Sequence, residues 1–441
     1  MSLIVLLILP SVTVTSIRVS SDSSVKGLGL LKSHVIEGVP YVAQNDFGCA
    51  YASLAMIFGY YGKNTSMMKN YYYCGAGYSF AYPRKPESIV TPPIVRPPYC
   101  FILRTSSTFS QGKEDWEFMS SLNGVESINY WPPKIVFNHF KAWNDYWTKI
   151  KNLVTQDNPV LTSVDPLAWP VYQEAMNMTK TPLLARAGHA IVIVGFNEKN
   201  RTICVQDPCA GSEKYYNPDR IGYQWIKLDV FKRALRRSFW DFRQNSYEMW
   251  AVKNITETPS FDTAFEMAHS KNIEKLKGNK SAYDSDFINP QFEQFGIKAL
   301  KTLRDDYKSL KLYLLYPFLK MSAKKTGPGK NACPFTKDSG YHTYEAAIQN
   351  NMSIFLQEIK TELTDEKLKQ ICDYESALFK NTSVKFYELA DNVSKLQDSL
   401  YEKSMLNFFL EVKTIKDTIV SVLDEIISIQ QAIIDGPPEE I

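Results

Sequence analysis

The residue of this chain best suited to nucleophilic chemistry is Cys49. It opens the segment 49–60, whose apolar residues recur at helical spacing and which Gly62 would end in a left-handed conformation. In the first turn of such a helix, unpaired backbone amides and the helix dipole favour the thiolate, the form of cysteine that attacks a carbonyl carbon. Gln44, just upstream, would bring a side-chain amide to the same sulfur and help the Cys49 amide to stabilise an oxyanion. A buried structural cysteine on a packed helix is the alternative interpretation.

A histidine and an aspartate that would complete such a site lie in a second segment, 188–208. Two apolar, β-branched runs flank a polar turn there, which predicts an antiparallel hairpin. A turn centred on Glu198 places 193 opposite 203 and His189 opposite Asp207, although a shift of one residue would break that pairing. A facing carboxylate would fix the imidazole tautomer and stabilise the imidazolium that forms when the thiol proton leaves sulfur. We therefore predict a nucleophilic cysteine with His189 as its base and Asp207 as the residue that orients the base. A structural histidine at the start of a strand is the alternative.

The composition of the chain changes near residue 258. Before it, short apolar runs alternate with helix-like segments, and 160–164 and 190–196 are the clearest strands. After it, Lys, Glu, Leu and Ile dominate, which indicates helices. We predict an α+β fold, with a mixed thiol domain at 25–258 and an all-α helical domain at 259–441. The helices expected in the second domain are 292–319, 344–363, 365–379, 384–401 and 406–434, with a loop at 322–340.

The overall composition excludes several classes of protein. Over 441 residues the hydrophobic fraction is 44%, the charged fraction 22% and the formal charge +3, which is typical of a globular protein with two or three domains. No dense Lys/Arg block is present, so the sequence gives no indication of nucleic-acid binding. The five histidines are far apart, and no Cys-x-x-Cys, glycine-rich phosphate loop or dinucleotide fingerprint occurs, so neither a metal nor another cofactor is expected. No apolar run after the N-terminal one is long enough for a membrane span.

The N-terminal residues are similar to a secretory leader. The apolar run Leu3–Leu9 has about the length of a signal-peptide core and is too short to cross a bilayer, although no Lys or Arg precedes it. Residues 1–24 are therefore a possible signal segment, with a short buried strand as the alternative. An even number of cysteines remains once Cys49 is set aside, which fits disulfides in an oxidising compartment and fits buried thiols equally well. Together with the Asn-x-Ser/Thr sequons, these features favour a secreted or cell-surface protein over a cytoplasmic one. The candidate glycosylation sites are Asn64, Asn177, Asn200, Asn254, Asn279, Asn351, Asn381 and Asn392.

The motifs around both segments resemble those of a known family. The pattern is Val39-Pro-Tyr-Val-Ala-Gln44…Gly48-Cys49…Ser53-Leu-Ala-Met56…Tyr60-Tyr-Gly62, followed by Gly188-His189-Ala-Ile-Val-Ile-Val-Gly195 and Asp207-Pro208. It is similar to that of the papain-like double-glycine leader peptidases, over about residues 35–255. The resemblance implies a papain-like domain with Cys49 as nucleophile, His189 as base, Asp207 as the third member and Gln44 as oxyanion donor.

A second resemblance extends over most of the chain. The segments Tyr73-Cys-Gly-Ala-Gly-Tyr-Ser-Phe-Ala-Tyr82, 159–166 and Phe295-Gly-Ile-Lys-Ala-Leu-Lys301 are similar to the butirosin biosynthesis protein H family, in which a papain-like domain precedes a helical one. The founding member moves an acyl group from a carrier protein to an amine. That family tends to carry His directly before its Cys, where this chain has Gly48. Four residues of the first segment are candidates for a substrate groove, with core packing as the alternative: Gly77, Tyr78, Phe80 and Tyr82.

The predicted reaction is acyl transfer through a thioester at Cys49. With water as the acceptor the protein would hydrolyse a peptide or amide bond, and this is the function we predict. An amine acceptor would make it an acyltransferase, and a secreted binding or surface protein that keeps the fold without turnover is a third possibility. The expected partner is a peptide or acyl substrate, and the sequence does not indicate an oligomeric state.

Overall fold

The computed structural model describes most of the chain. The predicted leader, the sequons at Asn64 and Asn177, and the cysteines Cys100 and Cys333 lie outside the described residues. The described ranges are 32–45, 48–63, 66–83, 104–105, 113–130, 139–165, 168–170, 189–213, 216–235, 247–283, 292–309, 334–402 and 405–438.

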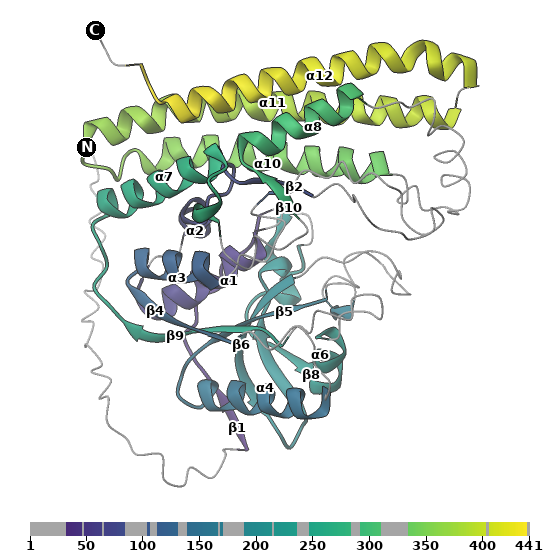
Figure 1. Ribbon diagram of the computed structural model, residues 1–441. Helices are drawn as coiled ribbons and strands as arrows, with labels where there is room; N and C mark the ends of the chain where they lie inside the picture. The colour runs from purple at the N-terminus through teal and green to yellow at the C-terminus, as the bar shows by residue number, and fades with distance from the viewer. Residues whose placement is uncertain are drawn as a thin grey trace, which may run out of the picture.

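A seven-stranded antiparallel sheet forms the centre of the first half of the chain (Figure 1). Its strand order is β4-β9-β5-β6-β7-β8, and β1 pairs with β6. The two predicted strands are confirmed as β5 and the greater part of β6. Strand β6 reads as a continuous apolar run because both of its faces are buried. The bounds are β1 Ser33–Val35, β4 Val125–Tyr130, β5 Val160–Val164, β6 His189–Asn197, β7 Thr202–Gln206, β8 Gln224–Lys227 and β9 Met249–Ile255.

Helix α1 (Cys49–Tyr60) carries the predicted nucleophile and has the predicted bounds. All residues from 51 to 58 are buried, because the helix lies between the sheet and the helices above it (Figure 1). Such a helix is apolar on every side. Gly62 has φ of 69°, so the helix ends in the left-handed conformation that the sequence predicts.

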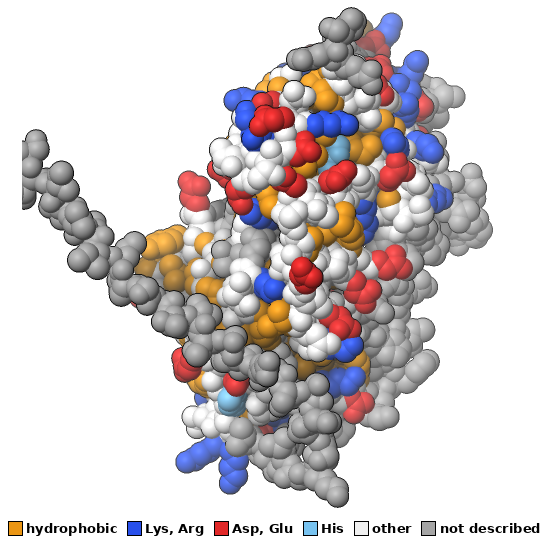
Figure 2. Space-filling model, turned by 90° about the vertical axis from the view of Figure 1, so that its left-hand side faces the viewer, with side chains coloured by type: hydrophobic (Ala, Val, Ile, Leu, Met, Phe, Trp, Pro, Cys, Tyr) orange, Lys and Arg blue, Asp and Glu red, His pale blue; other side chains and the backbone are white. Residues whose placement is uncertain are grey.

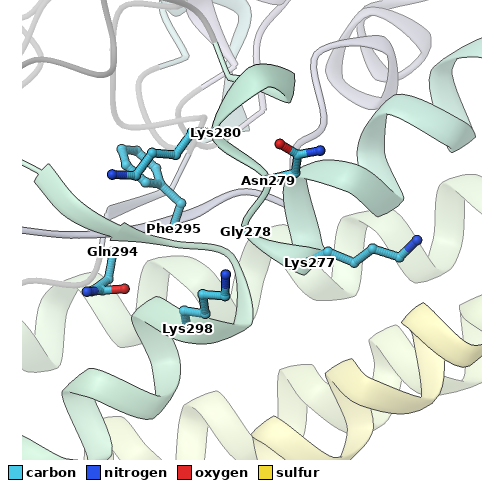
Figure 3. A pocket seen from close by; sticks show the side chains of 7 residues that line it. All are labelled: Lys277, Gly278, Asn279, Lys280, Gln294, Phe295 and Lys298. Atoms are coloured by element: carbon cyan, nitrogen blue, oxygen red, sulfur yellow. The ribbon is translucent and has the colours of Figure 1, made fainter.

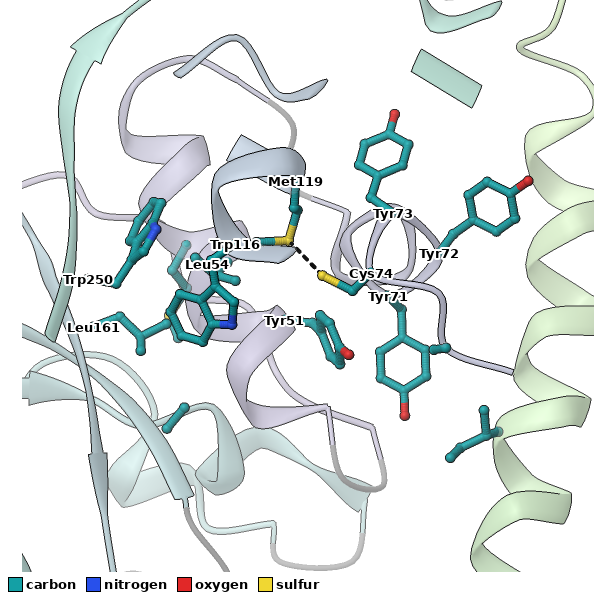
Figure 4. Close-up of a cluster of buried hydrophobic side chains, with 14 of the residues drawn as sticks. Tyr51, Leu54, Tyr71, Tyr72, Tyr73, Cys74, Trp116, Met119, Leu161 and Trp250 are labelled. Atoms are coloured by element: carbon teal, nitrogen blue, oxygen red, sulfur yellow. Dashed lines mark hydrogen bonds between the residues drawn. The ribbon is translucent and has the colours of Figure 1, made fainter. Parts of the chain in front are cut away.

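Other helices pack around α1 and the sheet. Helices α2 (Met67–Tyr73) and α3 (Lys113–Leu122) lie on the same side of the sheet as α1, whereas α4 (His139–Val154) covers the other side (Figure 1). Aromatic side chains from α1, α2, α3 and β9 meet in one buried cluster (Figure 4). Dense packing of this kind fixes the position of the first turn of α1, where Cys49 lies. The short helix α6 (Leu228–Ala234) follows β8.

The second half of the chain forms a layer of long helices (Figure 1). Two predictions for this region are wrong. The segments 365–379 and 384–401 belong to one helix, because the polar residues between them bond within the helical layer: Thr382 Oγ1 donates to the Leu378 carbonyl and Ser383 Oγ to the Ala346 carbonyl. The predicted loop ends too late, since helix already begins at 334. The bounds are α7 Phe261–Lys277, α8 Ile297–Ser309, α10 Pro334–Ile359, α11 Glu366–Glu402 and α12 Met405–Asp435.

A small second sheet joins the two halves. Strand β10 (Phe292–Phe295) lies where the sequence predicts the start of a helix, and it pairs with β2 (Phe80–Pro83), which pairs with β3 (Arg104–Thr105). The second half is therefore helical but not all-α. One hydrophobic core also runs through both halves and includes Tyr72 of α2 together with Phe355 of α10.

The predicted groove residues lie in this shared core rather than in an open groove. Tyr78 and Phe80 are fully buried, the Tyr78 hydroxyl donates to Glu375 of α11, and Phe80 packs against the same helix. The carbonyl of Gly77 accepts a hydrogen bond from α10, and the hydroxyl of Tyr82 donates one to α8. The structure therefore favours core packing for this segment. Its aromatic residues attach the helical layer to the first half.

Secretion stays a prediction, and the structure places five of the cysteines and six of the sequons. The five described cysteines, Cys49 among them, do not form disulfides. Among the glycosylation candidates, Asn392 is only 8% exposed, and its Nδ2 donates to the Glu388 carbonyl. Asn351 is half-buried in α10, and the remaining described candidates are exposed: Asn200, Asn254, Asn279 and Asn381.

Charges of both signs are mixed on one face of the molecule. On the face seen in Figure 2, Lys/Arg and Asp/Glu side chains are interspersed over the described residues. Of the helices that the structure describes, none has the length and apolarity needed to cross a membrane.

Candidate active site

Cys49 lies in the first turn of α1, and its sulfur faces the start of strand β6. The side chain of His189 and the backbone N–H of Ala190 both lower the pKa of the thiol, so both stabilise its thiolate form. Helix α1 packs directly on β6, which brings the first residue of the helix to the first residues of the strand. The backbone amides in the first turn of a helix have no intrahelical partner, so they favour negative charge at this position.

The side chains of His189 and Asp207 are hydrogen-bonded, with 2.8 Å between Nε2 and Oδ1. At this end of the hairpin, before a bulge at 193–195, the strand register behind that prediction is wrong by two residues, because Ile193 pairs with Val205 and not with 203. A two-residue shift leaves every side chain on the same face of the sheet, so His189 still reaches Asp207 diagonally. The contact is present although the predicted pairing is not.

The carboxylate of Asp207 is fully buried and accepts three hydrogen bonds. Oδ1 accepts from His189 Nε2 and from the Cys209 backbone N–H, each at 2.8 Å. Oδ2 accepts from Trp169 Nε1 at 2.7 Å. The bond to Cys209 also makes Asp207 the N-cap of the short 3₁₀ helix η2 (Pro208–Gly211). Donors on both oxygens hold the carboxylate in one orientation toward the histidine.

Sequence reasoning missed Trp169. A single tryptophan in an irregular segment gives no periodic signal, although one indirect signal was available. Strand β5 is antiparallel to β6, and its last residue, Val164, pairs with His189. Residues that follow β5 therefore emerge at the end of the sheet where the histidine lies, and Trp169 is a fully buried donor among them.

The two titratable groups at the sulfur favour an ion pair. Burial, the strongest influence, raises the pKa of Cys49, but the hydrogen bond and charge of His189 outweigh it, so the thiol pKa lies below its ordinary value. Burial lowers the pKa of His189, but the charge and hydrogen bond of Asp207 and the contact with Cys49 outweigh it and raise that pKa to about 10. Both shifts favour the thiolate–imidazolium pair over the neutral pair. Because Nε2 bonds to Asp207, Nδ1 is the ring nitrogen left to exchange a proton with the sulfur.

Gln44 lies beside the turn that carries Asp207. Its side chain is 5% exposed, and its backbone N–H donates to the Pro208 carbonyl at 2.9 Å. The side-chain oxygen Oε1 is buried without a hydrogen-bond partner among the described residues. Its assignment as an oxyanion donor stays a prediction.

A cavity of about 630 Å³ lies elsewhere in the molecule (Figure 3). It is lined by residues at the end of α7 and directly after it, by β10 and by α8, and none of the four predicted catalytic residues is among them. It is therefore distinct from the thiol site. Among the described residues, no group of three or more His, Cys, Asp or Glu side chains is placed to hold a metal ion. The lining residues are Lys277, Gly278, Asn279, Lys280, Gln294, Phe295 and Lys298.

Comparison with known proteins points to the same chemistry. Residues 36–229 match the model of the Peptidase_C39 like family. The matched segment contains Cys49, His189 and Asp207, and it relates this part of the chain to cysteine peptidases of the papain-like type. No curated protein matches the chain. The relation to the butirosin biosynthesis protein H family is not confirmed.

Proposed function

We propose that this protein hydrolyses a peptide or amide bond through a thioester at Cys49. The observation that carries the proposal is the series of interactions from the half-buried thiol to the buried His189 and from His189 to the buried Asp207. The similarity of residues 36–229 to the Peptidase_C39 like family supports the same chemistry.

In the first half of the reaction, the thiolate attacks the carbonyl carbon of the substrate. A C–S bond forms, and the carbonyl electron pair moves onto oxygen. We propose that the backbone N–H of Cys49 and the side-chain amide of Gln44 donate hydrogen bonds to this oxyanion. The imidazolium of His189 then gives its proton to the leaving nitrogen as the C–N bond breaks. An acyl thioester and a neutral imidazole remain.

In the second half, water replaces the amine that has left. His189 takes a proton from the water as its oxygen attacks the thioester carbon, and the C–S bond breaks to release the acid. The thiolate and the imidazolium are restored together. An amine in place of water would give acyl transfer through the same intermediate, so the acceptor is a question for experiment.

The proposal predicts one reactive thiol in the native protein. We expect iodoacetamide at neutral pH to alkylate Cys49 at least about tenfold faster than Cys204 or Cys372, because burial raises the pKa of each of these two to about 12. Mass spectrometry of the digested protein measures the three rates side by side, and Cys49→Ala should abolish the fast reaction. An unreactive Cys49 would show that the fold is kept without catalysis.

Formation of the thioester can be tested with a small acyl donor. p-Nitrophenyl acetate should add one acetyl group at Cys49, and the acetyl group should be absent from Cys49→Ala. Loss of that group in water alone supports hydrolysis, whereas loss only on addition of an amine refutes hydrolysis and assigns acyl transfer. No acetylation at Cys49 would refute both reactions.

A further inference from the structure

The extended segment that precedes α1 runs along the turn that carries Asp207. Two backbone-directed contacts join them: Gln206 Nε2 donates to the Val39 carbonyl at 2.8 Å, and the Gln44 N–H donates to the Pro208 carbonyl at 2.9 Å. The segment with the predicted oxyanion donor is thus tied to both sides of Asp207. Hydrogen bonds at several points along one segment hold it in a single register.

Between these two contacts lies the side chain of Tyr41. Its hydroxyl donates to the backbone carbonyl of Asp207 at 2.9 Å and accepts from the N–H of Gly211 at 2.7 Å. Burial raises the pKa of Tyr41, and although the Gly211 N–H opposes this effect, the hydroxyl stays protonated and able to donate. One side chain therefore connects the residue before η2 to the last residue of η2.

The packing around this hydroxyl leaves no room for adjustment. A Cβ atom on Gly211 would lie 2.9 Å from Tyr41 Cε1 and 3.0 Å from its hydroxyl oxygen. The same Cβ atom would lie 3.0 Å from the Cβ of Ala43. The turn can approach the segment this closely only because residue 211 has no side chain.

We propose that Tyr41 is a positioning residue of the active site, which orients the Asp207 turn and couples it to the segment carrying Gln44. The proposal rests on the proposed function, because it assigns Tyr41 a role in the reactivity of Cys49. The hydroxyl holds both ends of η2, and the N-cap of η2 is the same carboxylate that bonds to His189. Loss of the hydroxyl turns that carboxylate away from the imidazole and weakens the stabilisation of the imidazolium.

The test compares two half-buried tyrosine hydroxyls, one before α1 in the chain and one after it. Tyr41→Phe removes the proposed positioning contacts, and Tyr61→Phe removes a hydroxyl that donates to Asn158 at the far end of α1 from Cys49. The rate of Cys49 alkylation by iodoacetamide is measured against pH, with thermal unfolding measured in parallel. We expect both variants to unfold at a lower temperature. Only Tyr41→Phe should shift the pH midpoint of alkylation, upward by about one unit.

A second variant keeps the test decisive if Tyr41→Phe folds poorly. Gly211→Ala leaves the hydroxyl in place but pushes against it, so it should move the midpoint in the same direction. A midpoint in Tyr41→Phe equal to that in Tyr61→Phe, or an unmoved midpoint in Gly211→Ala, overturns the proposal. A wild-type protein without a fast thiol at Cys49 refutes the proposed function itself, and the positioning role with it.

Discussion

Replacing Asp207 with Asn should raise the pH at which Cys49 becomes reactive. The carboxylate accepts hydrogen bonds on both oxygens, from Trp169 on one and from His189 and the Cys209 N–H on the other. An asparagine has one acceptor oxygen and one donor NH₂ group. Whichever way it turns, the NH₂ faces a buried N–H, and the negative charge beside the imidazolium is lost.

The size of the effect follows from the lost charge. A hydrogen bond to a charged group contributes about 1.5–3 kcal/mol, and about 1.4 kcal/mol corresponds to one pKa unit. The raised pKa of His189 means that its proton is held up to about pH 10, and the lowered pKa of Cys49 means that the thiolate is present above a lower pH than usual. Loss of the charge lowers the pKa of His189 and so weakens the imidazolium that stabilises the thiolate. This indirect effect opposes the direct one, since the charge of Asp207 itself raises the thiol pKa, and we expect it to be the larger because the direct effect is the smallest of the influences on Cys49. We expect the thiol pKa to rise by about one to two units and alkylation at neutral pH to slow by about 10- to 100-fold.

The assay is the pH dependence of iodoacetamide alkylation at Cys49, quantified by mass spectrometry. The matched control is Asp229→Asn, since Asp229 is 72% exposed and forms a surface pair with Arg201 at 3.0 Å. That variant should follow the wild-type curve. If the Asp207→Asn curve also coincides with the wild-type curve, the reasoning that links Asp207 to the thiolate is wrong.

Three further substitutions give separate outcomes. Trp169→Phe keeps an aromatic ring but removes a 2.7 Å donor to Asp207 and part of a fully buried side chain, so the free energy of unfolding measured with denaturant should fall by at least about 2 kcal/mol. An unchanged value would contradict the importance of that bond. Gly48→Ala places a Cβ 2.7 Å from Met67 Sδ, so the start of α1 becomes overpacked. The free energy of unfolding should fall by about 1 kcal/mol in the same measurement. An unchanged value would mean that the methionine moves aside freely. Glu375→Gln weakens a buried contact of α11 with Tyr78 of the first half and a partly buried contact of α11 with His269 of α7. It should lower the melting temperature by several degrees without changing Cys49 alkylation, and an altered alkylation rate would show that the interface controls the site.

The elements that carry the site were largely predictable from the sequence. The bounds of α1 follow from its apolar pattern and the glycine at its end, and β5 and β6 follow from uninterrupted β-branched runs. Both signals are local, so they do not depend on how the rest of the chain folds. The contact of His189 with Asp207 was found through an incorrect register, because the side-chain period of two made a two-residue error harmless.

What the sequence did not reveal depends on contacts between distant segments. Trp169 meets Asp207 only after β5 and β6 have paired. Strand β10 has the composition of a helix start and is extended because β2 offers it hydrogen bonds. The break predicted inside α11 is absent because Thr382 and Ser383 find acceptors within the helical layer, which removes the cost of burying their hydroxyls.

Strand β9 limits where the chain could be cut if the thiol domain were transferred to another protein. The segment related to cysteine peptidases ends at 229, yet β9 (Met249–Ile255) lies between β4 and β5 in the middle of the sheet order. A module cut at the end of that segment would lose an interior strand and expose the backbone hydrogen-bonding groups of both neighbours. The thiol site and the beginning of the helical half therefore have to be exchanged as one piece, and a cut after β9 would still leave β2 without its β10 partner.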